Sequence, residues 1–98
     1  MPDISTRLKA LVVEDADNLR EVLVQVLSSG AYGLNLDATS ARDGNEAYAI
    51  ISRQKPDLLV TDVIMPRMNG SQLLERLVQD GIYLPTIVIS GTTTNVHA

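Results

Sequence analysis

The sequence predicts an α/β domain in which helices cover a parallel sheet. Short apolar runs alternate with segments of helical periodicity, and glycine or proline separates many of these segments. The 98 residues suffice for one domain and no more. Strands that are separated by helices pair in parallel through right-handed crossovers, so the alternation predicts one layered sheet.

The first strand and helix are the clearest elements. Residues 10–13 are a continuous apolar run, typical of a strand that is covered on both faces, and the run ends at Glu14 and Asp15. Gly30 stands where a glycine ends a helix. Between them, apolar residues recur at helical spacing, and we expect this stripe to belong to the core: Leu19, Val22, Leu23, Val26 and Leu27.

A second strand and helix follow. Leu34, Leu36 and Ala38 alternate with polar neighbours, which predicts a strand near a sheet edge. Asp43 and Gly44 turn the chain. A short helix then ends before Pro56, and its apolar positions are Ala47, Ile50 and Ile51.

The last predicted elements are two strands around a third helix. Residues 58–60 form a buried strand that leads to Asp62, and residues 87–89 form the fourth strand, which leads to Ser90. The helix between them ends at Gly81. Its apolar positions are Leu73, Leu74, Leu77 and Val78.

Acidic residues gather at one predicted edge of the sheet. In a flavodoxin-like strand order, 2-1-3-4, the crevice lies beyond the carboxyl ends of the first and third strands. Glu14, Asp15 and Asp62 leave these ends, and Ser90 leaves the fourth strand. Crowded carboxylates favour a cation, and hard oxygen ligands suit Mg²⁺. Such a site lets an aspartate attack a phosphoryl group while a hydroxyl bonds one phosphoryl oxygen.

The motifs resemble response-regulator receiver domains. Asp62 is followed by the residues of the family's phosphoacceptor motif, Met65-Pro66-x-Met68-Asn69-Gly70. Three further segments also match the family. They are the acidic pair Glu14-Asp15 after the first strand, the segment Ala41-x-x-Gly44-x-Glu46-Ala47 and the segment Pro85-x-Ile87-x-Ile89-Ser90-Gly91. Together these motifs cover the chain almost end to end, so residues 1–98 are interpreted as one receiver domain.

The resemblance implies a role for each matching residue. Asp62 is expected to accept a phosphoryl group from a sensor histidine kinase or a phosphotransfer protein. Asp15, Asp62 and the backbone carbonyl of Ile64 are expected to bind Mg²⁺, with Glu14 contributing through water. Ser90 is expected to contact the phosphoryl group and shift toward it. Because Ile64 is apolar, it should position attacking water poorly and slow dephosphorylation.

The chain departs from the family pattern after the fourth strand. The family has a fifth strand, which carries a lysine, and two further helices, whereas only residues 91–98 follow Ser90, fewer than a crossover needs. Lys9 and Lys55 precede strands and do not replace that lysine. We therefore expect an incomplete receiver domain with impaired phosphorylation or readout. A fourth strand left as an apolar edge predicts self-association, such as a dimer, or loose packing.

The motifs and these departures leave two functions open. The leading hypothesis is a phosphorylation-controlled switch of a two-component phosphorelay, not a multi-turnover enzyme. The alternative is an interaction or assembly module that keeps the site but does not switch. A hydrolase triad of Ser90, His97 and Asp62 lacks the G-x-S-x-G elbow. A metal-dependent phosphatase would have a second acid where Ile64 stands.

The amino-acid composition argues against several other classes of protein. The net charge of −4 and scattered basic residues argue against nucleic-acid binding by this domain. The absence of cysteine removes disulfides and thiolate metal sites. No apolar run approaches the ~18 residues of a membrane span, and the N-terminus does not resemble a signal peptide. These features predict a cytoplasmic domain.

Overall fold

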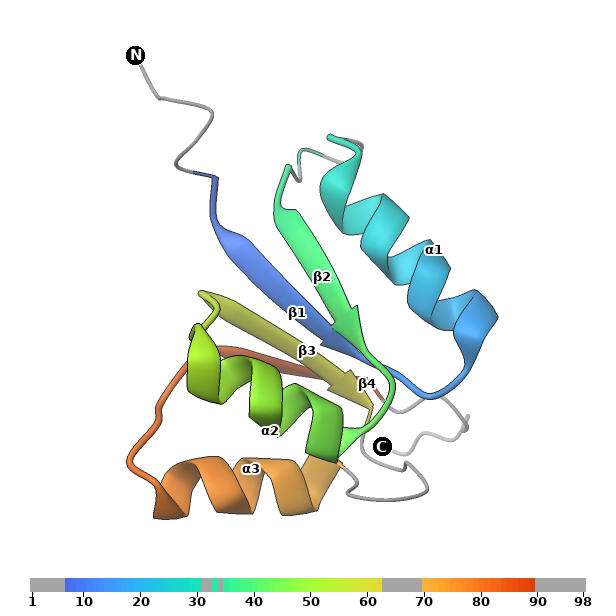
Figure 1. The fold of residues 1–98 in the computed structure, drawn as a ribbon. Helices are drawn as coiled ribbons and strands as arrows, with labels where there is room; N and C mark the ends of the chain where they lie inside the picture. Colours follow the sequence, from blue (N-terminus) through green and yellow to red (C-terminus); the bar gives the residue numbers. More distant parts are fainter. Residues whose placement is uncertain (1–6, 31–32, 34, 63–69, 90–98) are drawn as a thin grey trace, which may run out of the picture.

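The described residues form a four-stranded parallel sheet with three helices. The computed structural model describes residues 7–30, 33, 35–62 and 70–89. The elements are β1 (Lys9–Val13), α1 (Asp17–Ser28), β2 (Asp37–Ala41), α2 (Gly44–Arg53), β3 (Leu58–Asp62), α3 (Gly70–Gln79) and β4 (Thr86–Ile89) (Figure 1). The strand order β2-β1-β3-β4 confirms the predicted flavodoxin-like order 2-1-3-4. The predicted lack of a fifth strand and two helices concerns residues outside the described ranges.

The strand order places the helices on two faces. The crossover from β1 to β2 runs in one direction along the sheet, and those from β2 to β3 and from β3 to β4 run in the other. Right-handed crossovers therefore put α1 on one face and both α2 and α3 on the opposite face (Figure 1). The main core lies between the sheet and α2 and α3, and it contains Leu11, Val13, Ala41, Ala47, Ile51, Leu59, Leu73 and Leu77.

The prediction that the apolar stripe of α1 is core is wrong as stated. No residue of α1 is fully buried, and the side chains of Leu19 and Val22 are exposed at 37% and 52%. The helix packs over β2 and β1, at one side of the sheet. Part of its apolar stripe consequently extends past the surface that these two strands offer.

The second strand begins later than its sequence pattern predicts. Leu34 lies outside the described residues, and Leu36 precedes the strand, which starts at Asp37. The backbone amide of Leu36 donates to the carbonyl of Leu27 at 2.8 Å, at the end of α1. The Leu36 amide is thus bonded to the end of the helix, whereas the Asp37 amide donates to the carbonyl of Leu8 in the neighbouring segment.

Local signals at the helix ends behave as predicted. Gly30 follows α1 at φ 83°, and Gly81 follows α3 at φ 74°, both in the left-handed region that glycine adopts without strain. Asp43 does more than turn the chain, because its carboxylate accepts the backbone amide of Glu46 and caps α2.

Strand β4 forms one edge of the described sheet. It pairs only with β3 among the described elements, and its central residues Ile87 and Val88 are exposed at 52% and 50%. Successive strand residues point to opposite faces, so each face of this strand is only partly covered by the described residues.

Candidate functional site

Three predicted acids meet at the carboxyl edge of the sheet. Val13 of β1 lies beside Thr61 of β3, so Glu14 and Asp62 follow at neighbouring positions where these strands end. One carboxylate oxygen from each of Glu14, Asp15 and Asp62 lies within 4.8 Å of the others. We call these three residues the acidic cluster. Their convergence agrees with the sequence prediction and comes from the adjacency of β1 and β3.

Glu14 is the most buried member of the cluster. Its side chain is 2% exposed, against 8% for Asp62, whereas Asp15 is exposed. The Oε2 atom of Glu14 accepts the backbone amide of Ala16 at 3.0 Å. The Oε1 atom is buried and has no hydrogen-bond partner among the described residues. A buried carboxylate oxygen without a donor is costly, so this atom is suited to a cation or to water.

Burial raises the pKa of Glu14 to about 7. Removal of the carboxylate from water is the largest cause, and the negative charge of Asp62 adds to it, while the hydrogen bond from Ala16 acts in the opposite direction. Near neutral pH, the cluster by itself therefore holds a proton on Glu14 part of the time. A bound cation would compete with that proton.

The cluster fits Mg²⁺ by its donor set. Mg²⁺ takes oxygen ligands at ~2.1 Å, so opposite ligands of its octahedron lie about 4.2 Å apart. Adjacent ligands lie only about 3 Å apart. The three carboxylate oxygens lie within 4.8 Å of one another, so they would approach one another to bind Mg²⁺ directly, or some of them would bind it through water. Asp15 is open to solvent, and Glu14 has a buried oxygen without a hydrogen-bond partner among the described residues, so both acids have an oxygen that could act as a ligand beside Asp62.

Two predicted site residues cannot be placed. Ser90 and Ile64 lie outside the described residues, as does His97. Lys9 and Lys55 lie before or at the start of their strands, at the opposite end from the acidic cluster, as predicted.

Arg20 is a neighbour of the cluster that sequence reasoning missed. Its guanidinium donates to the backbone carbonyl of Glu14 at 3.0 Å and forms an ion pair with Asp17 at 2.5 Å. The Asp17–Arg20 spacing is a common helical ion pair, which gave no reason to single it out. The contact with the carbonyl appears only when the turn after β1 is seen. Arg20 therefore fixes the backbone that carries Glu14.

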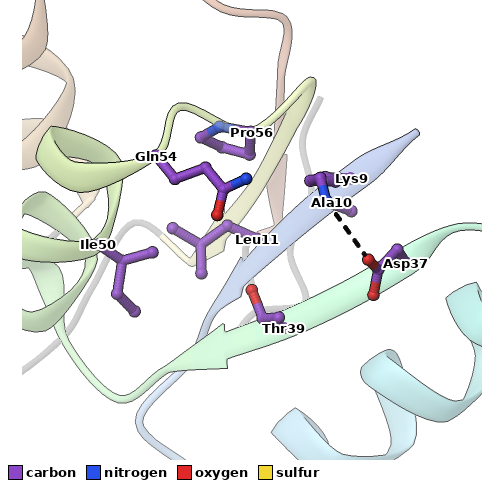
Figure 2. Close-up of a pocket in the computed structure, with 8 residues that line it drawn as sticks. All are labelled: Lys9, Ala10, Leu11, Asp37, Thr39, Ile50, Gln54 and Pro56. Atoms are coloured by element: carbon purple, nitrogen blue, oxygen red, sulfur yellow. Dashed lines mark ion pairs between the residues drawn. The ribbon is translucent and has the colours of Figure 1, made fainter. Parts of the chain in front are cut away.

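A hollow of about 300 Å³ opens at the amino ends of β1 and β2 (Figure 2). Leu11, Ile50 and Pro56 supply apolar walls, and Gln54 lines it from the end of α2. Lys9 and Asp37 form an ion pair at 3.8 Å on its rim. This hollow is at the far end of the strands from the acidic cluster and shares none of its residues.

Comparison with known proteins decides the family. The sequence matches the model of the response regulator receiver domain over residues 10–98. The chain belongs to this family. Membership implies a part in two-component signalling.

Individual relatives agree with this assignment. The chain is 37% identical over 94 residues to a protein-glutamate methylesterase/protein-glutamine glutaminase of Pyrococcus horikoshii, covering 95% of this chain and 24% of that protein. It is 37% identical over 84 residues to the response regulator MprA of Mycobacterium leprae, covering 86% of this chain and 35% of that protein. The chain thus spans about a quarter to a third of these curated relatives.

Solved structures show the same fold. The receiver domain of the Francisella response regulator 1452 has a TM-score of 0.76 at 29% identity, and the match covers 89% of this chain and 69% of that one. A response regulator receiver protein domain from Methanoculleus marisnigri has a TM-score of 0.76 at 27% identity, covering 90% and 70%. None of the helices in the described ranges has the length and apolar character needed to cross a bilayer.

Proposed function

We propose that this receiver domain accepts a phosphoryl group on Asp62 in a Mg²⁺-dependent reaction. The donor is a phosphohistidine of a sensor histidine kinase or phosphotransfer protein in the cytoplasm. The observation that carries the proposal is the convergence of Glu14 and Asp15 on Asp62 at the end of β3. The domain acts as a switch and not as a multi-turnover enzyme.

The proposed transfer forms an acyl phosphate. A carboxylate oxygen of Asp62 attacks phosphorus, a new O–P bond forms, and the N–P bond to histidine breaks. The electron pair of that bond stays on the imidazole nitrogen. Bound Mg²⁺ supplies positive charge that offsets the charge of the phosphoryl oxygens.

The residues of this chain hold the site in place. The Ala16 amide fixes one oxygen of Glu14, and the other oxygen is buried without a hydrogen-bond partner among the described residues. Arg20 holds the Glu14 carbonyl and so the turn that leads to Asp15. Thr61 donates its hydroxyl to the backbone carbonyl of Asp62 at 2.9 Å, which anchors the end of β3. The acids are thereby held on backbone that several contacts fix.

Acetyl phosphate tests the proposal without a cognate kinase. With Mg²⁺, mass spectrometry of the intact chain should show one added phosphoryl group, and EDTA should prevent the addition. Asp62→Asn should remove it. Asp57→Asn is the matched control, because this acid lies just before the start of the same strand, at the opposite end of the sheet. Equal phosphorylation of wild type and Asp62→Asn would contradict the proposal.

A second candidate is an assembly module that binds Mg²⁺ but does not switch. The observation that favours it is the position of the chain's two lysines, neither of which is at the carboxyl edge of the sheet. A fixed cation near the phosphoryl group is worth about 2–4 kcal/mol in comparable sites, and neither Lys9 nor Lys55 can supply it from the opposite end of the strands. Calorimetric Mg²⁺ binding with neither phosphorylation nor beryllofluoride binding would support this candidate.

A further inference from the structure

We infer that the hollow at the amino ends of β1 and β2 binds a small α-amino acid with an apolar side chain, in its zwitterionic form. The inference is independent of the proposed phosphorylation, because the hollow lies at the opposite end of the strands from the acidic cluster. All eight residues that line it are described residues. The hollow lies over β1 and β2, whereas β4, the last described strand, is at the other edge of the described sheet.

The floor of the hollow is apolar and belongs to the fold itself. Ala10 and Leu11 of β1 are 2% and 0% exposed, and Pro56 is also buried. Ile50 of α2 is half-buried and forms the wall beside Leu11 (Figure 2). The volume of about 300 Å³ is at the lower end of the range for small-molecule sites. This surface therefore suits a ligand with a short apolar side chain.

Two uncharged polar groups face the hollow. Figure 2 shows the carboxamide of Gln54, at the end of α2, and the hydroxyl of Thr39, on β2, directed into it. Thr39 lies beside Leu11 in the register of β1 and β2, so both side chains are on the same face of the sheet. Neither polar group forms a hydrogen bond with another described residue. Both are therefore available to the donors and acceptors of a ligand.

The charges on the rim select the head group of the ligand. The Nζ atom of Lys9 and the Oδ2 atom of Asp37 are 3.8 Å apart, which is longer than a hydrogen bond. The two side chains are 47% and 49% exposed, so both charges are accessible. An anion that approaches Lys9 is repelled by Asp37, and a cation that approaches Asp37 is repelled by Lys9.

A zwitterion meets both of these charges favourably. Its carboxylate accepts from the ammonium group of Lys9, and its own ammonium group donates to the carboxylate of Asp37. In an α-amino acid, the carboxylate, the ammonium group and the side chain share one carbon atom. A head group on the rim therefore directs the side chain into the hollow, against Leu11 and Ile50.

L-Leucine tests the inference in amide NMR spectra of the isotope-labelled full chain. It should shift the amide signals of Ala10, Thr39 and Gln54 with a dissociation constant on the order of millimolar, and leave that of Val22 on α1 unchanged. Isocaproate lacks the ammonium group and isopentylamine lacks the carboxylate. Each should bind about fivefold more weakly, the effect of one exposed ion pair. Absence of shifts with leucine, or equal binding of the three molecules, would overturn the inference.

Substitutions on the rim provide the second measurement. Lys9→Met and Asp37→Asn should each weaken leucine binding about fivefold, while the remaining amide signals show that the fold is kept. Lys55→Met is the control, because Lys55 is an exposed lysine before β3 that does not line the hollow. Equal leucine binding by Lys9→Met and Lys55→Met would overturn the inference.

Discussion

Replacing Glu14 with glutamine should change how the stability of the domain depends on pH. Glu14 is 2% exposed, and its pKa is raised from 4.5 to about 7 in the folded chain. Between these two values the folded state binds more protons than the unfolded state. The free energy of unfolding therefore falls as pH rises from about 4.5 to about 7, and the loss is complete above pH 7.

The size of this effect follows from the shift. Each pKa unit corresponds to about 1.4 kcal/mol, so Glu14 destabilises the metal-free fold by at most about 3–4 kcal/mol above pH 7, compared with its protonated state. The glutamine of Glu14→Gln cannot ionise, so the variant should not show this loss of unfolding free energy as pH rises. The difference in unfolding free energy between variant and wild type should grow with pH in favour of the variant.

Urea unfolding followed by far-ultraviolet circular dichroism measures the difference. Curves at pH 5, 6, 7 and 8 in EDTA should converge at low pH and separate at high pH. Glu21→Gln, at an exposed position of α1, is the control for the replacement of a glutamate by glutamine. Added Mg²⁺ at pH 8 should stabilise wild type more than Glu14→Gln. Parallel pH profiles for wild type and Glu14→Gln would refute the reasoning.

Three further predictions concern the core, a helix end and the proposed chemistry. Leu59→Ala removes a side chain that is 0% exposed and should cost about 2–5 kcal/mol in urea unfolding, whereas Leu8→Ala, at 58% exposure, should change stability little. Asp43→Ala removes the cap on the Glu46 amide and should cost about 1 kcal/mol, while an equal loss in Asp43→Asn would argue against capping. Ile64→Asn should shorten the half-life of the phosphorylated chain in Mg²⁺. An unchanged half-life would contradict the idea that Ile64 slows dephosphorylation.

Much of the fold follows from local sequence. Continuous apolar runs at residues 10–13 and 58–60 predicted central strands because strands covered on both faces need apolar residues at every position. Gly30 and Gly81 marked helix ends because both adopt positive φ. The convergence of the acidic cluster was also predictable, since parallel strands end at the same edge and right-handed crossovers limit their order.

Other features depended on contacts between distant segments. The stripe of α1 has the periodicity of a buried face, yet Val22 is 52% exposed, because burial depends on how much sheet lies beneath the helix. Leu36 alternates as a strand residue would, but its amide bonds to the end of α1. The Arg20 contact with the Glu14 carbonyl likewise requires the folded turn.

The sequence by itself determined which elements form and which acids leave the central strands, because these depend on residue type and spacing. Only the tertiary structure decided that Glu14 is buried with one oxygen unpartnered while Asp15 is exposed. Glu14 and Asp15 each contribute an oxygen to the acidic cluster, but the folded chain around them removes only Glu14 from water. That selection raises the pKa of Glu14 and makes its carboxylate available to a cation.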